Sequence, residues 1–463
     1  MTAHRLDPSI LREYDIRGVI GETLDAEDAR AIGQAFGTLL ARPEGAKVMV
    51  GYDGRLSSPL LEAALVEGLV ATGAEVHRVG RGPTPMLYFA GKTAVADGAI
   101  MITGSHNPPN HNGFKMVRDG ASFFGEAIQA LGHTVAEGNF TEGKGSVAEN
   151  FCFDAYVARL FEDYHGTRPL KVAWDAGNGA AGEAMAALAA RLPGTHLLLN
   201  AEIDGTFPVH HPDPTVEANL EQLRETVRKE ACDLGIAFDG DGDRIGVVDG
   251  KARILWGDQL MVVFAKDVLK TRPGSSIIAD VKASRTLFEE ISRLGGKPLM
   301  WRTGHSLIKT KMAEMKAPLA GEMSGHIFFA DHYYGYDDAL YAAVRLLDIV
   351  SRSKESLADM RDALPATVNT PEIRLPCPDD RKFAVLEEVK ARLRRRPLKE
   401  GVVVHDVDGV RVETAAGWWL LRPSNTQAVL VVRAEAKDVE TLGRLKSELA
   451  AELRASGIDV PVF

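Results

Sequence analysis

Hydrophobic positions along the first 340 residues repeat one order of elements three times. In the first unit, an apolar run at 47–53 precedes an apolar-periodic helix at about 59–71, and further apolar runs follow near 76–79, 98–102 and 113–117. Short apolar runs predict buried strands, whereas apolar residues spaced three and four apart predict a helix. The pattern therefore predicts an α/β unit that ends in a short return strand.

Two further units follow the same order. The second has predicted strands at 170–175, 196–200, 234–238 and 244–248 with a helix at about 181–191, and the third has strands at 276–281, 298–301, 317–320 and 326–329 with a helix near 286–294. Strands separated by helices predict mainly parallel sheets, with the return strand as the antiparallel exception. We expect three similar α/β domains over residues 1–150, 151–252 and 253–365.

The pattern changes near Pro365, after a strongly periodic helix at 339–351. The rest of the chain predicts a fourth domain of α+β type, over residues 366–463. Its predicted elements are a strand at 372–375, a helix at 381–393, strands within 402–421 and 428–433, and an amphipathic helix at 439–454. A chain of 463 residues is too long for one hydrophobic core, which agrees with several domains.

Composition and charge narrow the class of ligand and the compartment. The net charge is −10, and an acidic surface repels phosphate backbones, so we expect a small anion met by local Arg and Lys rather than nucleic acid. The cysteines Cys152, Cys232 and Cys377 are widely separated, which excludes a disulfide framework and a thiolate zinc site. No signal peptide or membrane-length apolar run is found, so we expect a cytoplasmic protein without a membrane partner.

Polar loops follow the third strand of each unit, at 103–107, 239–244 and 321–326. Ligands of α/β folds bind at the carboxyl ends of the strands. Because the three strands are equivalent in their units, we expect the three loops to converge on one cleft.

The first loop, Thr-Gly-Ser-His-Asn-Pro-Pro at 103–109, ends a buried strand at a serine. Gly104 permits a close approach to the backbone, and the two prolines stiffen the following loop. The sequence therefore predicts an exposed, stiffly held Ser105 hydroxyl at the carboxyl end of the sheet. A serine that only caps a local turn is the alternative.

The second loop, Asp-Gly-Asp-Gly-Asp-Arg at 239–244, has the strongest chemical signal. Alternating carboxylates with glycines between them turn several hard oxygens onto one cation, which suits Mg²⁺ or Ca²⁺. An EF-hand is excluded because Arg244 and Gly250 stand where it requires Gly and Glu. An acidic surface turn is the alternative, although three carboxylates this close repel one another. A Mg²⁺ held here would keep positions open for a phosphate oxygen, and Ser105 is a candidate to hold that phosphate.

A loop of the fourth domain offers groups that suit a phosphate. Arg422 is followed by Ser424, Asn425 and Thr426, so a guanidinium fork, hydroxyls and an amide stand together between two predicted strands. A surface hairpin is the alternative interpretation.

Phosphoryl transfer also requires cations around the phosphoryl oxygens and an acid or base at the sugar oxygen. Arg17 and Lys115 supply cations near the first unit's loop, although either could be a solvated charge. Glu322 and Ser324 offer partners for sugar hydroxyls. Two further candidates, which could equally be ordinary loop histidines, are His305 and His326.

Taken together, these motifs closely resemble one family, the α-D-phosphohexomutases, and within it the bacterial phosphomannomutase/phosphoglucomutase group. The matching motifs are Tyr-Asp-Ile-Arg-Gly at 14–18, Thr-Gly-Ser-His-Asn-Pro at 103–108, Asp-Gly-Asp-Gly-Asp-Arg at 239–244, Gly-Glu-Met-Ser-Gly-His at 321–326 and Arg-x-Ser-Asn-Thr at 422–426. They occur in the family's order and span nearly the whole chain. The resemblance implies a heart-shaped four-domain enzyme whose last domain is similar to the TATA-binding-protein fold.

The resemblance also implies a role for each matching residue. It makes Ser105 the phosphoserine and assigns Mg²⁺ to Ser105, Asp239, Asp241 and Asp243. Catalytic roles around the transferring phosphoryl group are implied for Arg17, His106, Lys115, Arg244 and His305, with Lys115 and His305 as the candidate general acid and base. Substrate contacts are implied for Tyr14, Lys282, Gly304, His305, Glu322, Ser324, His326, Arg422, Ser424, Asn425 and Thr426. Gln427-Ala428 departs from the Thr-Pro that the family often has there.

The implied activity is that of an isomerase of carbohydrate metabolism, which interconverts hexose 1-phosphate and hexose 6-phosphate, of glucose or mannose, through a phosphoserine and glucose 1,6-bisphosphate or its mannose counterpart. Small sugar phosphates would be its partners, and we expect a monomer. A phosphoglucosamine mutase is the alternative, but that group commonly has Gln where Met323 stands. A non-catalytic sugar-phosphate-binding protein, the third possibility, would need no serine nucleophile.

Overall fold

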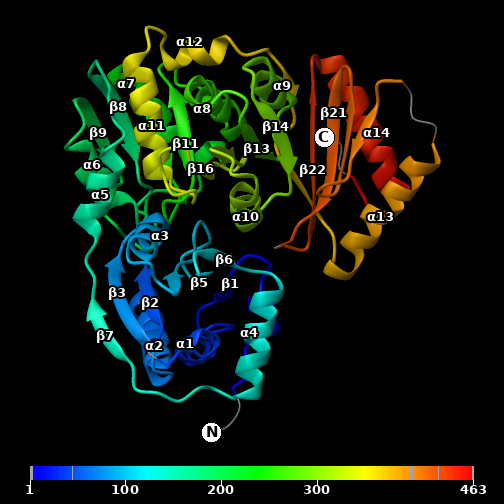
Figure 1. Cartoon of the computed structure of the whole chain (residues 1–463). Coiled ribbons are helices and arrows are strands. Elements are labelled where there is room, and N and C mark those ends of the chain that lie inside the picture. Colours follow the sequence, from blue (N-terminus) through cyan, green and yellow to red (C-terminus); the bar gives the residue numbers. More distant parts are fainter. Residues whose placement is uncertain (1–3, 44, 397–399, 426, 461–463) are drawn as a thin grey trace.

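The structure is a computed structural model that describes residues 4–43, 45–396, 400–425 and 427–460. Within these residues the strands form four separate sheets, which follow one another along the chain and are arranged as an arc in Figure 1. No helix in this part of the chain is both long and apolar enough to span a bilayer. The arc leaves the N-terminal and C-terminal units facing each other.

The first unit is built around a seven-stranded sheet. Its elements are η1 (Pro8–Ile10), β1 (Ile16–Val19), α1 (Ala26–Leu40), β2 (Lys47–Tyr52), α2 (Ser58–Ala71), β3 (Glu75–Arg81), α3 (Thr84–Thr93), β4 (Gly98–Ile102), β5 (His111–Arg118), β6 (Ala121–Phe123), α4 (Glu126–Glu137) and β7 (Ser146–Glu149). The strand order is β1-β5-β4-β2-β3-β7, with β6 beside β5. Strands β4, β2 and β3 are parallel, and β5 returns antiparallel to β4.

The second unit has a five-stranded sheet in the order β12-β11-β10-β8-β9. Its elements are α5 (Phe153–Phe161), β8 (Leu170–Asp175), α6 (Gly182–Ala189), β9 (Gly194–Leu199), η2 (Glu217–Leu220), α7 (Glu221–Glu230), β10 (Leu234–Phe238), β11 (Ile245–Asp249) and β12 (Ile254–Leu255). The return strand β11 is antiparallel to β10, and every residue of both strands is buried.

The third unit has a four-stranded sheet in the order β14-β13-β15-β16. Its elements are α8 (Gly257–Thr271), β13 (Ser276–Asp280), α9 (Arg285–Arg293), β14 (Lys297–Trp301), α10 (His305–Met315), β15 (Leu319–Gly321), β16 (Ile327–Phe329), α11 (Ala339–Arg352) and α12 (Leu357–Asp362). In all three units the order across the sheet is therefore return strand, third strand, first strand, second strand. The antiparallel return strand is the part of this arrangement that the repeated pattern predicts.

The fourth unit differs, because all its strand pairs are antiparallel. Its elements are β17 (Val368–Asn369), β18 (Ile373–Pro376), α13 (Asp379–Arg395), β19 (Val403–His405), β20 (Val410–Thr414), β21 (Gly417–Pro423), β22 (Val429–Ala436) and α14 (Val439–Arg454). Helices α13 and α14 both pack against β21 and β22. Three α/β sheets followed by this unit confirm the predicted fold class, whereas the domain boundaries at 150, 252 and 365 stay predictions.

One hydrophobic core runs through the first three units, joining α3 of the first to α5, α6, α8 and α11. A second core lies on the other face of the first sheet, and the fourth unit has its own. The fourth unit meets the third through Trp418 and Leu420, which pack on Val281. Arg411 adds hydrogen bonds to the Val281 and Ala283 carbonyl oxygens, both at 2.7 Å.

Several helices were not expected from the periodic pattern, among them α1, α3, α4, α5, α7, α8 and α10. Helix α3 shows why. Its residues from Thr84 to Ala90 are all buried, so the helix has no polar face to alternate with an apolar one. Its proline in the first turn suits a helix start but also suits a loop.

Candidate active site

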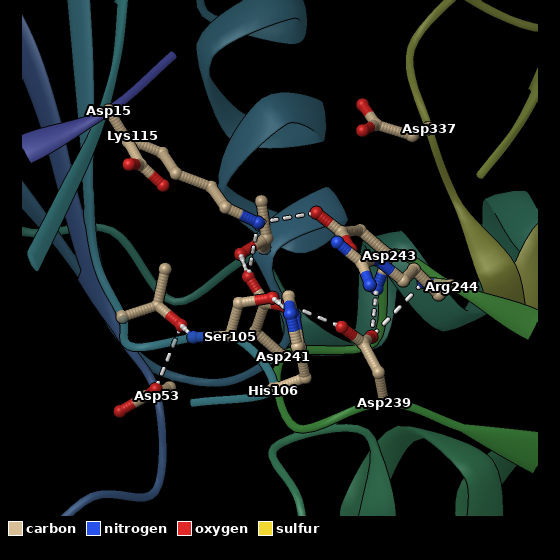
Figure 2. Close-up of polar contacts among 12 residues, drawn as sticks. Asp15, Asp53, Ser105, His106, Lys115, Asp239, Asp241, Asp243, Arg244 and Asp337 are labelled. Carbon is tan, nitrogen blue, oxygen red and sulfur yellow. Dashed lines mark hydrogen bonds and ion pairs between the residues drawn. The ribbon is translucent and has the colours of Figure 1, made fainter. Parts of the chain in front are cut away.

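Ser105 lies directly after β4, between the first and second units. Its Oγ is 3.2 Å from Asp239 Oδ2 and 3.1 Å from His106 Nδ1 (Figure 2). Its φ is 50°, a left-handed value that a non-glycine residue adopts only where its surroundings enforce it. The backbone is thus held firmly, as the sequence predicts.

The predicted exposure of Ser105 is wrong, since only 2% of the residue is accessible. The acidic loop of the second unit, at 239–244, covers Ser105. A Cβ on Gly240 would lie 2.3 Å from the Ser105 carbonyl oxygen, so this close approach of two loops requires glycine. The sequence could place Ser105 at the end of its own sheet but could not show that a second sheet end lies on top of it.

Asp239, Asp241 and Asp243 are fully buried, which excludes the alternative of an acidic surface turn. One oxygen from each lies within 4.8 Å of the others. Burial, then the charges of Asp243 and Asp241, raises the pKa of Asp239 well above its ordinary value. Asp241 Oδ1 is buried without a hydrogen-bond partner in the described part of the chain. Three crowded carboxylates with an unused oxygen are what a divalent cation would satisfy.

Lys115 extends from β5 to this triad, and its Nζ donates to Asp243 Oδ2 and, at 2.7 Å, to Asp241 Oδ2 (Figure 2). Although burial opposes it, Asp241 and Asp243 raise the pKa of Lys115 well above its ordinary value. The ammonium is therefore charged in this arrangement. Two other predicted cations, Arg17 and Arg244, also lie at the site.

Arg17 stands on β1, which pairs with β5 in a register that sets Arg17 against Gly113. Its guanidinium pairs with Asp15 and donates to Asn107 Oδ1 at 3.3 Å. Arg244 Nε lies 3.2 Å from His326 Nε2, so the loops of the second and third units are in contact. The three strand-end loops thus meet, as the repeated pattern predicts.

His305 and His326 lie side by side, with ring centroids 5.4 Å apart. Burial, then the charge of Lys309, lowers the pKa of His305 well below its ordinary value, so its ring is neutral. His326 differs, because the Asp243 carboxylate overcomes burial and raises its pKa to about 9. The same site therefore holds a neutral imidazole and a charged one.

Glu322 forms two contacts in the third unit that hold the loop at 321–326 in place. Its Oε1 accepts the Gly304 N–H at 2.6 Å, and its Oε2 lies 2.8 Å from His326 Nδ1. Ser324 Oγ lies 3.4 Å from the same nitrogen. Glu322, Ser324, Gly304 and His326 are thus one hydrogen-bonded group beside His305.

The predicted phosphate-binding residues of the fourth unit lie next to the third unit. Arg422 is the penultimate residue of β21 rather than part of the loop, and its Nε donates to Asp408 Oδ2 at 3.0 Å. Lys282 Nζ donates to Glu372 Oε2 at 3.0 Å. Ser424 and Asn425 follow β21, and Thr426 lies outside the described residues.

Tyr14 joins three units. Its hydroxyl donates to the Thr303 carbonyl oxygen at 2.8 Å and accepts from Asn425 Nδ2 at 2.7 Å. The Thr303 N–H in turn donates to Asp408 Oδ2 at 3.0 Å. Burial raises the pKa of Tyr14 to about 12, so the hydroxyl keeps its proton. The first, third and fourth units are therefore in contact around the site.

Sequence reasoning missed several residues that shape the site. Asp337 is fully buried, with Oδ1 2.9 Å from Lys309 Nζ and Oδ2 3.5 Å from His305 Nδ1. It comes from the segment before α11, where no sequence motif marks it. Asp53 and Arg55 lie beneath the Ser105 loop. The internal repeat could have indicated them, because Asp53 follows β2 and Asp280 ends β13, the equivalent strand of the third unit.

Four models of the phosphoglucomutase/phosphomannomutase family match successive parts of the chain. They describe alpha/beta/alpha domain I at residues 8–142, domain II at 154–252, domain III at 256–368 and the C-terminal domain at 372–452.

Full-length relatives agree with these matches. The chain is 46% identical over 461 residues to a phosphomannomutase/phosphoglucomutase of Pseudomonas aeruginosa, covering 99% of this chain and 98% of the relative. It is 40% identical to a phosphoglucomutase of Neisseria gonorrhoeae, covering 96% and 97%. A crystal structure of a phosphoglucomutase/phosphomannomutase family protein from Burkholderia thailandensis superposes with a TM-score of 0.92 at 43% identity, covering 99% of this chain and all of that one.

Proposed function

Because the chain belongs to the phosphoglucomutase/phosphomannomutase family, we propose that phosphorylated Ser105 gives its phosphoryl group to a hexose phosphate and takes one back. The chain is an isomerase that interconverts hexose phosphates. One observation supports the assignment to Ser105 above all. A serine with φ of 50° holds its Oγ 3.2 Å from the first carboxylate of a buried acidic triad.

The transfer needs two steps that balance. In the first, the 6-oxygen of a hexose 1-phosphate attacks phosphoserine and the P–O bond to Ser105 breaks, while the 6-hydroxyl proton goes to a base and Ser105 Oγ takes a proton from an acid. In the second, after the bisphosphate turns around, Ser105 Oγ gives up its proton and attacks the 1-phosphoryl group, the P–O bond to the sugar breaks, and the 1-oxygen takes a proton. Lys115, Arg17 and Arg244 supply the positive charge that these phosphoryl oxygens require.

Proton transfer is assigned to His305 and Lys115 by their charge states. The His305 imidazole is neutral and its Nδ1 has no hydrogen-bond partner among the described residues, so His305 is the candidate base for the sugar hydroxyl. Lys115 keeps its proton beside Asp241 and Asp243, so it is the candidate acid. His106, 3.1 Å from Ser105 Oγ, lies where it contacts the serine in either step.

The acidic triad fits a magnesium ion. Asp239, Asp241 and Asp243 offer hard oxygens, one of them unsatisfied, and Ser105 Oγ or its phosphate would complete the set. A bound Mg²⁺ would neutralise charge on the phosphoryl oxygens of Ser105. We propose this ion and a hexose 1,6-bisphosphate, such as glucose 1,6-bisphosphate, as the enzyme's cofactor and activator.

The sugar and its second phosphate are assigned to the third and fourth units. Glu322 and Ser324 suit the 3- and 4-hydroxyls, and Arg422 with Ser424, Asn425 and Thr426 suits the phosphate that is not transferred. Substrate contacts from Tyr14, Lys282, Gly304 and His326 follow from their places around these groups. Contacts to the 3- and 4-hydroxyls alone accept the sugar in either orientation and with either configuration at carbon 2, so we propose activity on both glucose and mannose phosphates.

The phosphoserine is tested by intact-mass measurement of purified protein before and after incubation with glucose 1,6-bisphosphate. We expect an adduct of about 80 Da, the mass added by phosphorylation, which Ser105→Ala abolishes together with nearly all mutase activity. Thr103→Ser, which keeps a hydroxyl two residues away, is the matched control and should retain both. Full activity of Ser105→Ala would overturn the assignment.

Assays of glucose, mannose and glucosamine phosphates side by side test the choice of sugar. We expect turnover of the glucose and mannose compounds. Glucosamine phosphate as the preferred substrate would instead favour a phosphoglucosamine mutase.

A further inference from the structure

The internal repeat relates two pairs of residues at the ends of first strands. Asp53 and Arg55 follow β2 in the first unit, and Asp280 and Lys282 end and follow β13 in the third. In both units the first strand pairs with the third strand in parallel, up to Ile102 in one and Gly321 in the other. Each Asp therefore stands beside the loop that follows its unit's third strand.

The two carboxylates make equivalent contacts with these loops. Asp53 Oδ2 accepts the Gly104 N–H at 3.2 Å and the Thr103 hydroxyl at 2.8 Å. Asp280 Oδ1 accepts the Met323 N–H at 3.2 Å. One carboxylate thus holds the loop of Ser105, and the other holds the loop of the sugar-binding candidates.

The basic residues have diverged. Lys282 pairs with Glu372 at the edge of the fourth unit. Arg55 instead turns beneath its own unit's loop and donates to four backbone carbonyl oxygens. Its Nη2 binds those of Ser105 at 2.7 Å and Asn107 at 2.6 Å, and its Nη1 binds those of His111 at 3.0 Å and Pro108 at 2.5 Å.

The surroundings of Arg55 make this arrangement rigid. The side chain is fully buried, and the Phe207 ring of the second unit lies 5.1 Å from its guanidinium carbon. A Cβ on Gly104 would lie 2.5 Å from the guanidinium, so the loop lies directly on it. Water is excluded from the guanidinium, which supplies a hydrogen bond to each of the four carbonyl oxygens, and the Pro108 oxygen also accepts the His111 N–H at 3.0 Å.

We propose that Asp53 and Arg55 are positioning residues for phosphoryl transfer, a role that rests on the proposed function of Ser105. They hold the Ser105 backbone at its left-handed φ, with Oγ directed at Asp239. Arg55 also offsets the partial negative charge of the converged carbonyl oxygens beside a phosphoserine that carries about two negative charges.

Replacement of Arg55 tests the role because lysine keeps the charge but not the planar fork. Arg55→Lys should lower kcat by about 10- to 100-fold, the loss expected when a reacting group moves by about 1 Å. KM for hexose 1-phosphate should stay within about twofold, because neither residue contacts the sugar. Phosphorylation of the dephosphorylated variant by glucose 1,6-bisphosphate should slow by the same factor as kcat.

Arg78→Lys is the matched control. Arg78 forms a two-contact ion pair with the buried Glu62 in the same unit, away from the Ser105 loop. The Arg78→Lys variant should have a lower melting temperature than wild type and an unchanged kcat. Asp53→Asn is the second variant, because the amide keeps the shape of the carboxylate but loses an acceptor. If Arg55→Lys does not fold, the kcat and the phosphorylation of Asp53→Asn decide the test.

The outcomes separate this inference from the proposed function. Normal kcat and normal phosphorylation in a folded Arg55→Lys or Asp53→Asn variant overturn the positioning role, as does an equal fall of kcat in Arg78→Lys. Wild-type protein that accepts no phosphate, together with an active Ser105→Ala, would instead overturn the role of Ser105 itself.

Discussion

At the scale of single residues, burial and neighbouring charges together decide which groups hold protons. Lys115 and His305 are both titratable bases within one site, yet carboxylate neighbours keep the lysine charged, whereas burial and Lys309 keep the histidine neutral. The two histidines of the site, His305 and His326, would carry the same charge in water, but here one is neutral and the other charged. The proposed division of acid and base roles therefore rests on the position of each residue relative to the acidic triad.

The triad itself gives a prediction for Asp241→Asn. The change keeps the side-chain shape but removes one charge, so we expect Mg²⁺ affinity and kcat/KM to fall at least roughly 10-fold, the smaller loss seen even for outer partners of metal ligands. The loss of repulsion within the triad offsets the loss of the Asp241–Lys115 ion pair, so the metal-free melting temperature should change little. Metal titration and calorimetric melting measure both effects. Undiminished Mg²⁺-dependent activity in Asp241→Asn would argue that the triad is not the metal site.

At the scale of elements, the ends of strands place the chemistry. Ser105 follows β4, the acidic triad follows β10, Glu322 follows β15 and Ser424 follows β21. Loops from the first three sheets meet directly, and the fourth unit joins them through the contact of Asn425 with Tyr14.

Arg422 tests the element from the fourth unit. A guanidinium–phosphate contact is strong in a closed site from which water is excluded. Arg422→Ala should therefore raise KM and lower kcat/KM by about 10- to 100-fold, or ~1.5–3 kcal/mol for a charge-assisted hydrogen bond. Ser105 should still accept phosphate from glucose 1,6-bisphosphate. Steady-state kinetics with hexose 1-phosphate decide, and an unchanged KM would mean that this part of β21 does not bind substrate.

The end of β8 gives a prediction of pH dependence. His210 Nε2 lies 2.9 Å from Asp175 Oδ2, and this hydrogen bond raises the pKa of His210. A raised folded-state pKa stabilises the fold fully below the unfolded value of about 6.5 and less as pH rises through the folded value. Wild type should therefore exceed His210→Gln in melting temperature most at about pH 5.5 and least at about pH 8.5. The same substitution at the exposed His133 is the control, and an advantage that grows with pH would contradict the assignment.

At the scale of the whole molecule, the site exists only where the units meet. Tyr14 of the first unit contacts Thr303 of the third and Asn425 of the fourth, so one hydroxyl ties the two ends of the arc to its middle. Asp408 binds both Arg422 and the Thr303 N–H, which adds a second tie between the third and fourth units. Relative motion of the fourth unit would break these contacts together.

Tyr14→Phe tests this closure. The variant loses a donor to Thr303 and an acceptor for Asn425, so we expect KM to rise roughly 5- to 150-fold, from two hydrogen bonds worth about 0.5–1.5 kcal/mol each. Small-angle X-ray scattering of the ligand-free variant should give a larger radius of gyration than wild type. Unchanged dimensions with an unchanged KM would show that Tyr14 does not hold the fourth unit.

The sequence by itself determined the three-fold repeat, the antiparallel return strands, the separate character of the last unit and the loops that hold the chemistry. These features depend on short-range patterns, namely apolar runs of strand length and polar residues at their ends, which are legible without long-range contacts. Buried helices such as α3 were not predicted, because an element covered on every side loses its amphipathic pattern.

Only the tertiary structure decided how the loops meet. Ser105 is buried because Gly240 of another unit lies on it, Lys115 is charged because two carboxylates from that unit surround it, and Arg55 braces the Ser105 loop because four carbonyl oxygens converge there. Each of these facts depends on contacts between residues far apart along the chain. Hydrophobic and polar patterns specify which face of an element is buried, but the neighbour that buries it is set by how the units pack.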